Sequence, residues 1–293
     1  MSTSSFNYLK NSLILTIAVA ISTILATSVK ALQVQVSPAK PKLGDTLTVV
    51  VTPDDPTTSS NPSVTVNNKT YPAFAIAPNK YRAFLPTTPL QKPGTRALQV
   101  KAGAETKQLS VLVGDRKFPV QRIRLSPGKA GLKATEHELN RVAALKALKT
   151  PQKFWNGAFL KPNKGAITTI YGVRRYYNGK FAQDYYHRGV DYAGATGSPV
   201  IAPADGKIAL VGRVSQGFRV HGNIIGIDHG QGVITTYLHL SRISVKEGDI
   251  VKAGQVIGAV GSTGAVTGPH LHWGLYVQGE AVDPSPWRNS KFN

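Results

Sequence analysis

Three short histidine-bearing segments in the last third of the chain limit its fold more than any other feature, because their side chains have to meet. The segments are His187–Asp191, Tyr237–Leu240 and Gly268–His272, and they hold four of the seven histidines of the chain. Residues two or four positions apart share one face of a β-strand. We therefore expect the histidines and the aspartate to lie on strands that are distant in sequence and converge on one cavity.

These side chains predict a metal centre. Zinc in catalytic sites takes three protein ligands and leaves one position open for water. Hydrolysis also needs groups that accept a proton and stabilise the developing charge, so five candidates leave two for this work. The five candidates are His187, Asp191, His239, His270 and His272. The other histidines lie in a polar helical stretch (His137) or beside a hairpin (His221 and His229), and we predict that they are solvated or structural.

The histidine segments belong to a longer series of motifs between about Trp155 and Trp287. In order, these motifs are His187–Tyr192, Gly197–Gly206, Asp228–Gly232, Tyr237–Ser241, Val245–Asp249, Gly261–Gly264, Thr267–Trp273 and Val282–Pro284. In kind and in order they resemble the lysostaphin-like (LytM-type) zinc metalloendopeptidases, which cut the peptide cross-bridges of peptidoglycan.

The resemblance implies a role for each of the five candidates. It implies that His187, Asp191 and His272 bind one zinc ion and that His239 and His270 are catalytic, and it leaves open which of these two is the base. The implied substrates are the stem and cross-bridge peptides of peptidoglycan. Some relatives have lost metal ligands and only activate other wall hydrolases, whereas this chain keeps all five residues. A non-catalytic wall-binding or hydrolase-activating protein on the same fold is the alternative function.

The segment 154–293 is predicted to be a β-rich peptidase domain. Gly230–Gly232 indicates a hairpin turn between strands at Ile224–His229 and Val233–Leu240. The stretch Val245–Gly258 resembles the hybrid barrel of lipoyl and biotinyl carrier domains. A carrier function is disfavoured, because no lysine has the flanking pattern of a modified lysine and a carrier has no use for five converging metal and acid–base residues.

A tyrosine-rich segment directly precedes the first histidine motif. Arg174–Gly179 contains an Asn-Gly turn signal and leads to Asp184–Tyr186, so we expect a hairpin-like loop at the mouth of the groove. Its tyrosines either pack along an extended peptide or are ordinary surface residues.

Residues 32–117 are predicted to form an all-β module. Short segments with alternating apolar side chains are separated by turn signals, which is typical of an immunoglobulin-like sandwich. The expected strands are Leu32–Val36, Thr46–Val51, Ser63–Val66, Arg96–Val100 and Gln108–Val113. The module has no cluster of histidines or acids, so we expect it to act as a spacer, to dock or to cover part of the site.

Residues 118–153 are predicted to be a basic linker with one helix. Thr135 and Glu138 form a capping-box pattern, apolar residues from Leu139 to Leu148 follow at helical spacing, and Thr150-Pro151 ends the helix. The expected fold is therefore mainly β: an immunoglobulin-like sandwich, a short helical linker, and a β-rich metallopeptidase domain that resembles a hybrid barrel.

Residues 1–31 have the pattern of an export signal. Lys10 precedes an apolar run from Leu13 to Ala26, and Val29–Ala31 has the form of a cleavage site. An uncleaved signal would anchor the chain in a membrane through residues 13–29. We therefore predict an exported protein of the periplasm, the cell envelope or the extracellular space.

Composition agrees with export and suggests partners. The chain has no cysteine, which excludes a disulfide framework and a lipid-modified cysteine. Its net charge of +20 favours anionic envelope polymers. Basic charge also suits nucleic acid, but export and the lack of any nucleic-acid-binding motif argue against that partner.

Overall fold

The computed structural model describes residues 1–2, 31–56, 61–124, 132–289 and 292. Ala31 to Asn293 form one compact unit. The predicted signal peptide or anchor lies almost entirely outside the described residues and stays a prediction. Within the described ranges, no helix is long and apolar enough to cross a membrane.

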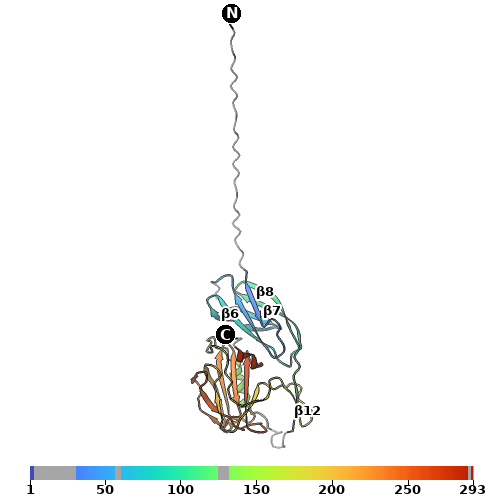
Figure 1. The fold of residues 1–293 in the computed structure, drawn as a ribbon, viewed down its shortest axis with the longest axis vertical. Coiled ribbons are helices and arrows are strands. Elements are labelled where there is room, and N and C mark those ends of the chain that lie inside the picture. Colours follow the sequence, from blue (N-terminus) through green and yellow to red (C-terminus); the bar gives the residue numbers. More distant parts are fainter. Residues whose placement is uncertain (3–30, 57–60, 125–131, 290–291, 293) are drawn as a thin grey trace. The chain divides into compact units, whose positions relative to one another are not determined.

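The predicted mainly β architecture is confirmed, beginning with two four-stranded antiparallel sheets at the N-terminal end (Figure 1). One sheet has the order β1 (Gln33–Ser37), β2 (Thr46–Thr52), β6 (Lys80–Pro86) and β5 (Phe74–Ala77). The other has the order β4 (Lys69–Pro72), β3 (Ser63–Val66), β7 (Gly94–Ala102) and β8 (Glu105–Val113). Both sheets contribute to one apolar core, for example through Val49 and Leu98. The immunoglobulin-like topology stays a prediction.

Three strands of this module, β4, β5 and β6, were not predicted. For the central strand β6, the burial of both faces explains why it was not predicted. Ala83 and Leu85 face the core between the two sheets, while Phe84 belongs to the core of the C-terminal half. Because both faces of β6 are buried, its sequence lacks the polar–apolar alternation that marks a half-exposed strand.

The linker contains the predicted helix and an additional strand. Helix α2 (Glu136–Ala147) starts at Thr135, whose hydroxyl accepts the Glu138 N–H. Upstream of it, β9 (Val120–Ile123) pairs in parallel with β11 (Arg174–Tyr177), which also pairs with β12 (Lys180–Phe181). Strand β9 is thus attached to the C-terminal half of the chain, and α2 packs on the same half through Leu145, which lies against Gly226.

An eight-stranded sheet forms the centre of the C-terminal half (Figure 1). Its order is β10 (Ile167–Thr169), β13 (Val190–Ala193), β21 (His270–Val277), β17 (Val233–Leu238), β16 (Ile224–Gly230), β15 (Gly206–Gly212) and β19 (Ile250–Val251), and β22 (Glu280–Ala281) pairs with β21. A small sheet has the order β14 (Pro199–Ile201), β20 (Val256–Ala259) and β18 (Arg242–Ile243), and two 3-10 turns are η1 (Val214–Gln216) and η2 (Ser285–Asn289). The predicted hairpin turn at Gly230–Gly232 is confirmed between β16 and β17, with Gln231 at a φ of 53°.

Aromatic side chains join the two halves of this compact unit. The Phe84 ring lies with its centroid 5.4 Å from that of Trp287 and 6.2 Å from that of Trp155. Beside it, the buried Arg82 guanidinium donates to Gln231 Oε1 at 2.7 Å and to the Phe292 carbonyl at 3.0 Å. The domain boundaries drawn at 118 and 154 stay a prediction.

Candidate metal centre and active site

The strand β21 brings most of the predicted site residues together. His272 on this strand is paired in register with Asp191 on β13 and with Leu238 on β17, the residue before His239. His270 precedes His272 by two positions on the same strand and therefore shares its face. The two-residue spacing of His270 and His272 therefore places both side chains on one face of a strand, as predicted.

The spacing argument for His187 was wrong, although the residue is in the right place. His187 lies in an irregular segment, and β13 begins only at Val190. The chain reaches the site because Gly189 packs against β21: a Cβ atom on this glycine would lie 2.3 Å from the Trp273 carbonyl oxygen and 2.8 Å from His272 Nε2. Close backbone approach, and not strand alternation, brings His187 to Asp191.

Three potential ligand atoms converge at this point. His187 Nε2, Asp191 Oδ1 and His272 Nδ1 lie 2.9 Å, 2.9 Å and 3.0 Å from one another. His187 Nδ1 lies 2.8 Å from the Ile170 carbonyl oxygen, to which it donates, so in the neutral ring the Nε2 atom presents a lone pair to the cluster. Lone pairs this close repel unless a cation lies between them. Ligands of a tetrahedral zinc ion are about 3.3 Å apart, so two imidazoles and one carboxylate in this arrangement fit a metal ion.

The residues around the ligands hold them in place. The Ile170 carbonyl fixes the His187 ring, as is usual for metal-binding histidines. Arg175 Nη2 lies 3.8 Å from Asp191 Oδ2, whereas the two histidine ligands contact Oδ1, and Arg175 also donates to the Tyr185 hydroxyl at 3.0 Å. Burial raises the pKa of Asp191, but the close contacts of its carboxylate with the His187 and His272 rings outweigh this and hold the pKa well below its usual range. Asp191 is therefore a carboxylate.

Sequence reasoning did not identify Ile170 or Arg175 as parts of the site. Ile170 acts through its backbone carbonyl, which no residue type reveals. Arg175 lies in the hairpin that the Asn-Gly signal predicted, and its position among aromatic residues just before the His187 motif was the available signal.

His239 and His270 lie together beside this cluster. Their ring centroids are 5.1 Å apart, and His270 Nε2 is 3.8 Å from Asp191 Oδ1. Each ring donates its Nδ1–H to a backbone carbonyl at 2.9 Å, that of Thr263 for His239 and that of Gly268 for His270. Both rings therefore keep Nε2 as a potential proton acceptor. Burial, together with the nearby His272 and His270 rings, lowers the pKa of His239 to about 3, so this ring is neutral near pH 7.

The other three histidines lie outside the cluster, as expected. His137 is exposed on α2 and meets Phe218 edge-on. His229 is buried, donates from Nδ1 to the Asp205 carbonyl at 2.7 Å and lies 2.8 Å from the Thr235 hydroxyl through Nε2. His221 bonds through Nδ1 to Glu138 on α2.

The tyrosine-rich segment forms the predicted hairpin. Asn178 and Gly179 have φ values of 49° and 83° and connect β11 to β12. Tyr186 is buried, and its hydroxyl donates to the Ala281 carbonyl at 3.1 Å, so it is a core residue. Tyr177 and Tyr185 lie beside Arg175, and contact with a peptide substrate stays a prediction for them.

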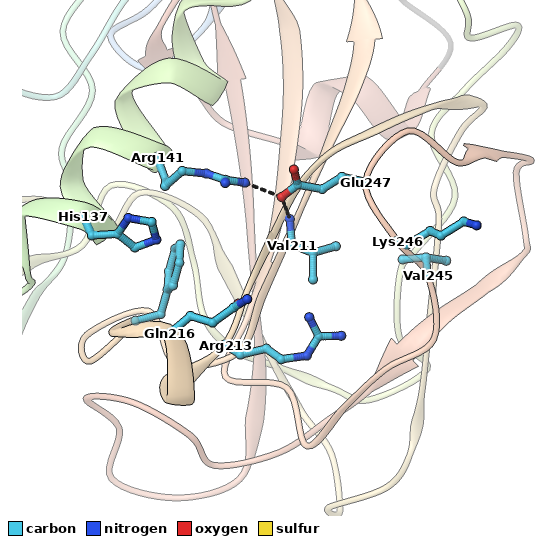
Figure 2. Close-up of a pocket in the computed structure, with 9 residues that line it drawn as sticks. His137, Arg141, Val211, Arg213, Gln216, Val245, Lys246 and Glu247 are labelled. Carbon is cyan, nitrogen blue, oxygen red and sulfur yellow. Dashed lines mark hydrogen bonds and ion pairs between the residues drawn. The ribbon is translucent and has the colours of Figure 1, made fainter.

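A cavity of about 580 Å³ opens elsewhere, between α2 and the loops that follow β15 and β18 (Figure 2). Arg141 of α2 reaches Glu247 across it, and the Glu247 carboxylate also accepts the Val211 N–H at 2.7 Å (Figure 2). None of the five predicted site residues lines this cavity. The metal cluster therefore remains the candidate catalytic centre.

The cluster of His187, Asp191 and His272, with two further histidines beside it, has the composition of a metallopeptidase site. The sequence profile of Peptidase family M23 matches residues 185–284, which include all five site residues. The chain therefore carries a peptidase domain of family M23, of the LytM and lysostaphin type.

Curated relatives match over the same region. The chain is 49% identical over 98 residues to the DD-carboxypeptidase/endopeptidase Mpg of Neisseria meningitidis serogroup B. The aligned region covers 33% of this chain and 22% of the relative. It is 45% identical over 109 residues to the glycyl-glycine endopeptidase ALE-1 of Staphylococcus capitis, covering 36% of this chain and 29% of the relative. The chain thus spans less than a third of the length of these relatives.

A solved structure is similar over most of the chain. A crystal structure from Pseudomonas aeruginosa that was assigned to peptidase M23 has 29% sequence identity and a TM-score of 0.63, and the match covers 86% of this chain and 96% of that one. The similarity in fold therefore extends upstream of residues 185–284.

Proposed function

We propose that the protein is a zinc-dependent endopeptidase that hydrolyses peptide cross-links of bacterial peptidoglycan. The observation that carries this proposal is the convergence of His187, Asp191 and His272 beside two further histidines that keep free Nε2 atoms. The names of the M23 relatives, an endopeptidase of the DD type and one of the glycyl-glycine type, support the substrate class.

The proposed division of roles follows from the hydrogen bonds of each side chain. His187, Asp191 and His272 would hold the zinc ion, which when bound polarises the scissile carbonyl and activates water. His239 and His270 direct Nε2 away from the carbonyls that hold their Nδ1–H groups. One of these rings would accept the proton of the attacking water at Nε2 and pass it to the leaving amine, and the other, when protonated at Nε2, would stabilise the charge that develops on the carbonyl oxygen.

The cell envelope is the location that we propose, because peptidoglycan lies outside the cytoplasmic membrane. The net charge of +20 would favour retention on anionic envelope polymers. Anchoring through residues 13–29 remains part of this proposal.

Digestion of a soluble, cross-linked peptidoglycan fragment by the full chain tests the proposal. Mass spectrometry with and without a zinc chelator should show chelator-sensitive cleavage of a peptide cross-link, and it identifies the bond. His239→Ala should lower kcat/KM at least about 100-fold and retain zinc, whereas His137→Ala, which changes an exposed histidine, should match the wild type. Undiminished cleavage by His239→Ala, or no cleavage by a zinc-loaded wild type, would refute the proposal and favour a binding role.

A further inference from the structure

Glu138 on helix α2 is a fully buried carboxylate that binds a loop of the catalytic half. Its side chain is 0% exposed and accepts the backbone N–H groups of Arg219 (3.0 Å), Val220 (3.1 Å) and His221 (2.7 Å). It also bonds to His221 Nδ1 at 2.5 Å. A buried charge normally carries a high desolvation cost, so this arrangement ties the loop firmly to the helix.

The same loop holds the backbone of His239. The His221 carbonyl accepts the His239 N–H at 3.1 Å. Asn223 then bonds twice to Leu240, accepting its N–H at 3.0 Å and donating from Nδ2 to its carbonyl at 2.9 Å.

The ring of His239 is fixed through the same loop. Its Nδ1–H donates to the Thr263 carbonyl, and the Thr263 hydroxyl accepts the Asn223 N–H at 3.0 Å. Gly222 packs so closely on Thr263 that a Cβ atom would lie 2.5 Å from its carbonyl carbon. The backbone and the ring of His239 therefore both depend on the position of residues 219–223.

His239 needs such support because of its backbone conformation. Its φ is +66°, a left-handed conformation that costs a non-glycine residue free energy and persists only where the surroundings enforce it. Strand β17 ends at Leu238, so the sheet does not hold His239. Its backbone is held by the His221 carbonyl, which accepts its N–H, and by the Thr263 N–H, which donates to its carbonyl at 3.4 Å.

From these contacts we propose that Glu138 is a positioning residue for His239, acting through the loop 219–223. The proposal rests on the proposed function, in which His239 takes part in hydrolysis. Helix α2 can serve as a fixed support, because Val142 and Leu145 are buried and Leu145 packs on Gly226 of β16. Glu138 lies upstream of residues 185–284, the part of the chain that matches family M23, so part of the catalytic machinery is held from outside the matched domain.

Substitution of Glu138 in the full chain tests whether this residue positions His239. Glu138→Gln and Glu138→Ala should lower kcat on a cross-linked muropeptide at least about ten-fold, because small displacements of a catalytic group are costly. KM should stay within about two-fold and one zinc per chain should be retained, since neither depends on His239. Glu136→Ala, which removes an exposed acid from the same turn of α2, is the matched control and should behave as the wild type.

A second readout separates positioning from a merely structural role. In ¹⁵N-histidine spectra of the folded variants, the His239 ring signal, assigned by its loss in His239→Ala, should move away from that of the Nδ1–H tautomer. If both Glu138 variants fail to fold, Asn223→Ala tests the loop through which Glu138 is proposed to act, because it leaves Glu138 in place and removes the Nδ2 bond to Leu240.

The outcomes separate the two proposals. A kcat within about two-fold of the wild type in folded Glu138 variants, or a loss explained by zinc content or folded fraction with an unchanged His239 signal, would overturn the positioning role. An inactive wild type, or a fully active His239→Ala, would instead refute the proposed function.

Discussion

Gly189 allows the most direct test of how the metal site is built. Its backbone is not left-handed, so alanine is conformationally acceptable and only the added methyl group matters. That Cβ atom would lie 2.3 Å from the Trp273 carbonyl oxygen, whereas ordinary contact begins at 3.4 Å. The difference, 3.4 − 2.3, is about 1.1 Å. The His187–Val190 segment and β21 must separate by this distance if no other atoms move.

This separation would move the predicted metal ligands relative to one another. His272 and Asp191 are paired across the same two strands, and zinc–ligand distances vary by only about 0.2 Å. Overpacking costs about 1–3 kcal/mol. If that strain acts on the ligands, Gly189→Ala lowers zinc affinity by about 10- to 100-fold, because 1.4 kcal/mol corresponds to a factor of ten.

Competition with a chromophoric chelator measures this affinity, and urea unfolding of the metal-free protein measures the strain itself. Gly268→Ala is the matched control, since a Cβ atom there meets nothing within 4 Å. Equal zinc affinity and equal unfolding free energy in the two variants would show that the close packing of Gly189 does not hold the ligands.

Three further predictions follow from buried charges. Asp191→Asn should lower zinc affinity at least about 100-fold, because it removes an anionic ligand; retention of one zinc through dialysis would contradict this. Burial raises the pKa of Glu138, but the bonds from His221 and Val220 outweigh it and lower the pKa from 4.5 to about 2, so its stabilising effect is complete above pH 4.5 and is lost as the pH falls toward 2. The stability advantage of the wild type over Glu138→Gln in urea titrations should thus shrink by at most about 3 kcal/mol between pH 6 and pH 2, and a constant difference would exclude this linkage. Arg82→Ala should lower the free energy of unfolding by about 2–4 kcal/mol, because it removes two buried hydrogen bonds from a charged group and leaves a cavity, whereas Lys80→Ala on the same strand should change it by less than about 0.5 kcal/mol.

Local sequence patterns were informative where one residue type has one strong local preference. Alternation predicted most strands of the first sheets, such as β7 and β8, because each exposes one face. Asn178-Gly179 predicted a hairpin, since both residues accept positive φ. The two-residue spacing of His270 and His272 predicted a shared face because both lie in one strand.

Glu138 shows where this kind of reasoning stops. The capping-box pattern predicted the N-terminus of α2, and the Thr135 hydroxyl does accept the Glu138 N–H. The pattern also assigns the Glu138 carboxylate to the same helix end, but it bonds to the loop at 219–221, about eighty positions away. A polar side chain has several possible partners, and only tertiary packing selects one.

The sequence by itself determined which chemical groups are present: five side chains that can bind a metal or exchange protons, a mainly β chain and a basic, cysteine-free composition. Tertiary structure alone decided how His187 reaches Asp191, why β6 is buried on both faces and what supports His239 in its left-handed conformation. The physical reason is that periodicity and turn preference report the surroundings of a residue within a few positions, whereas close backbone approach and buried hydrogen bonds join segments whose sequences carry no sign of each other.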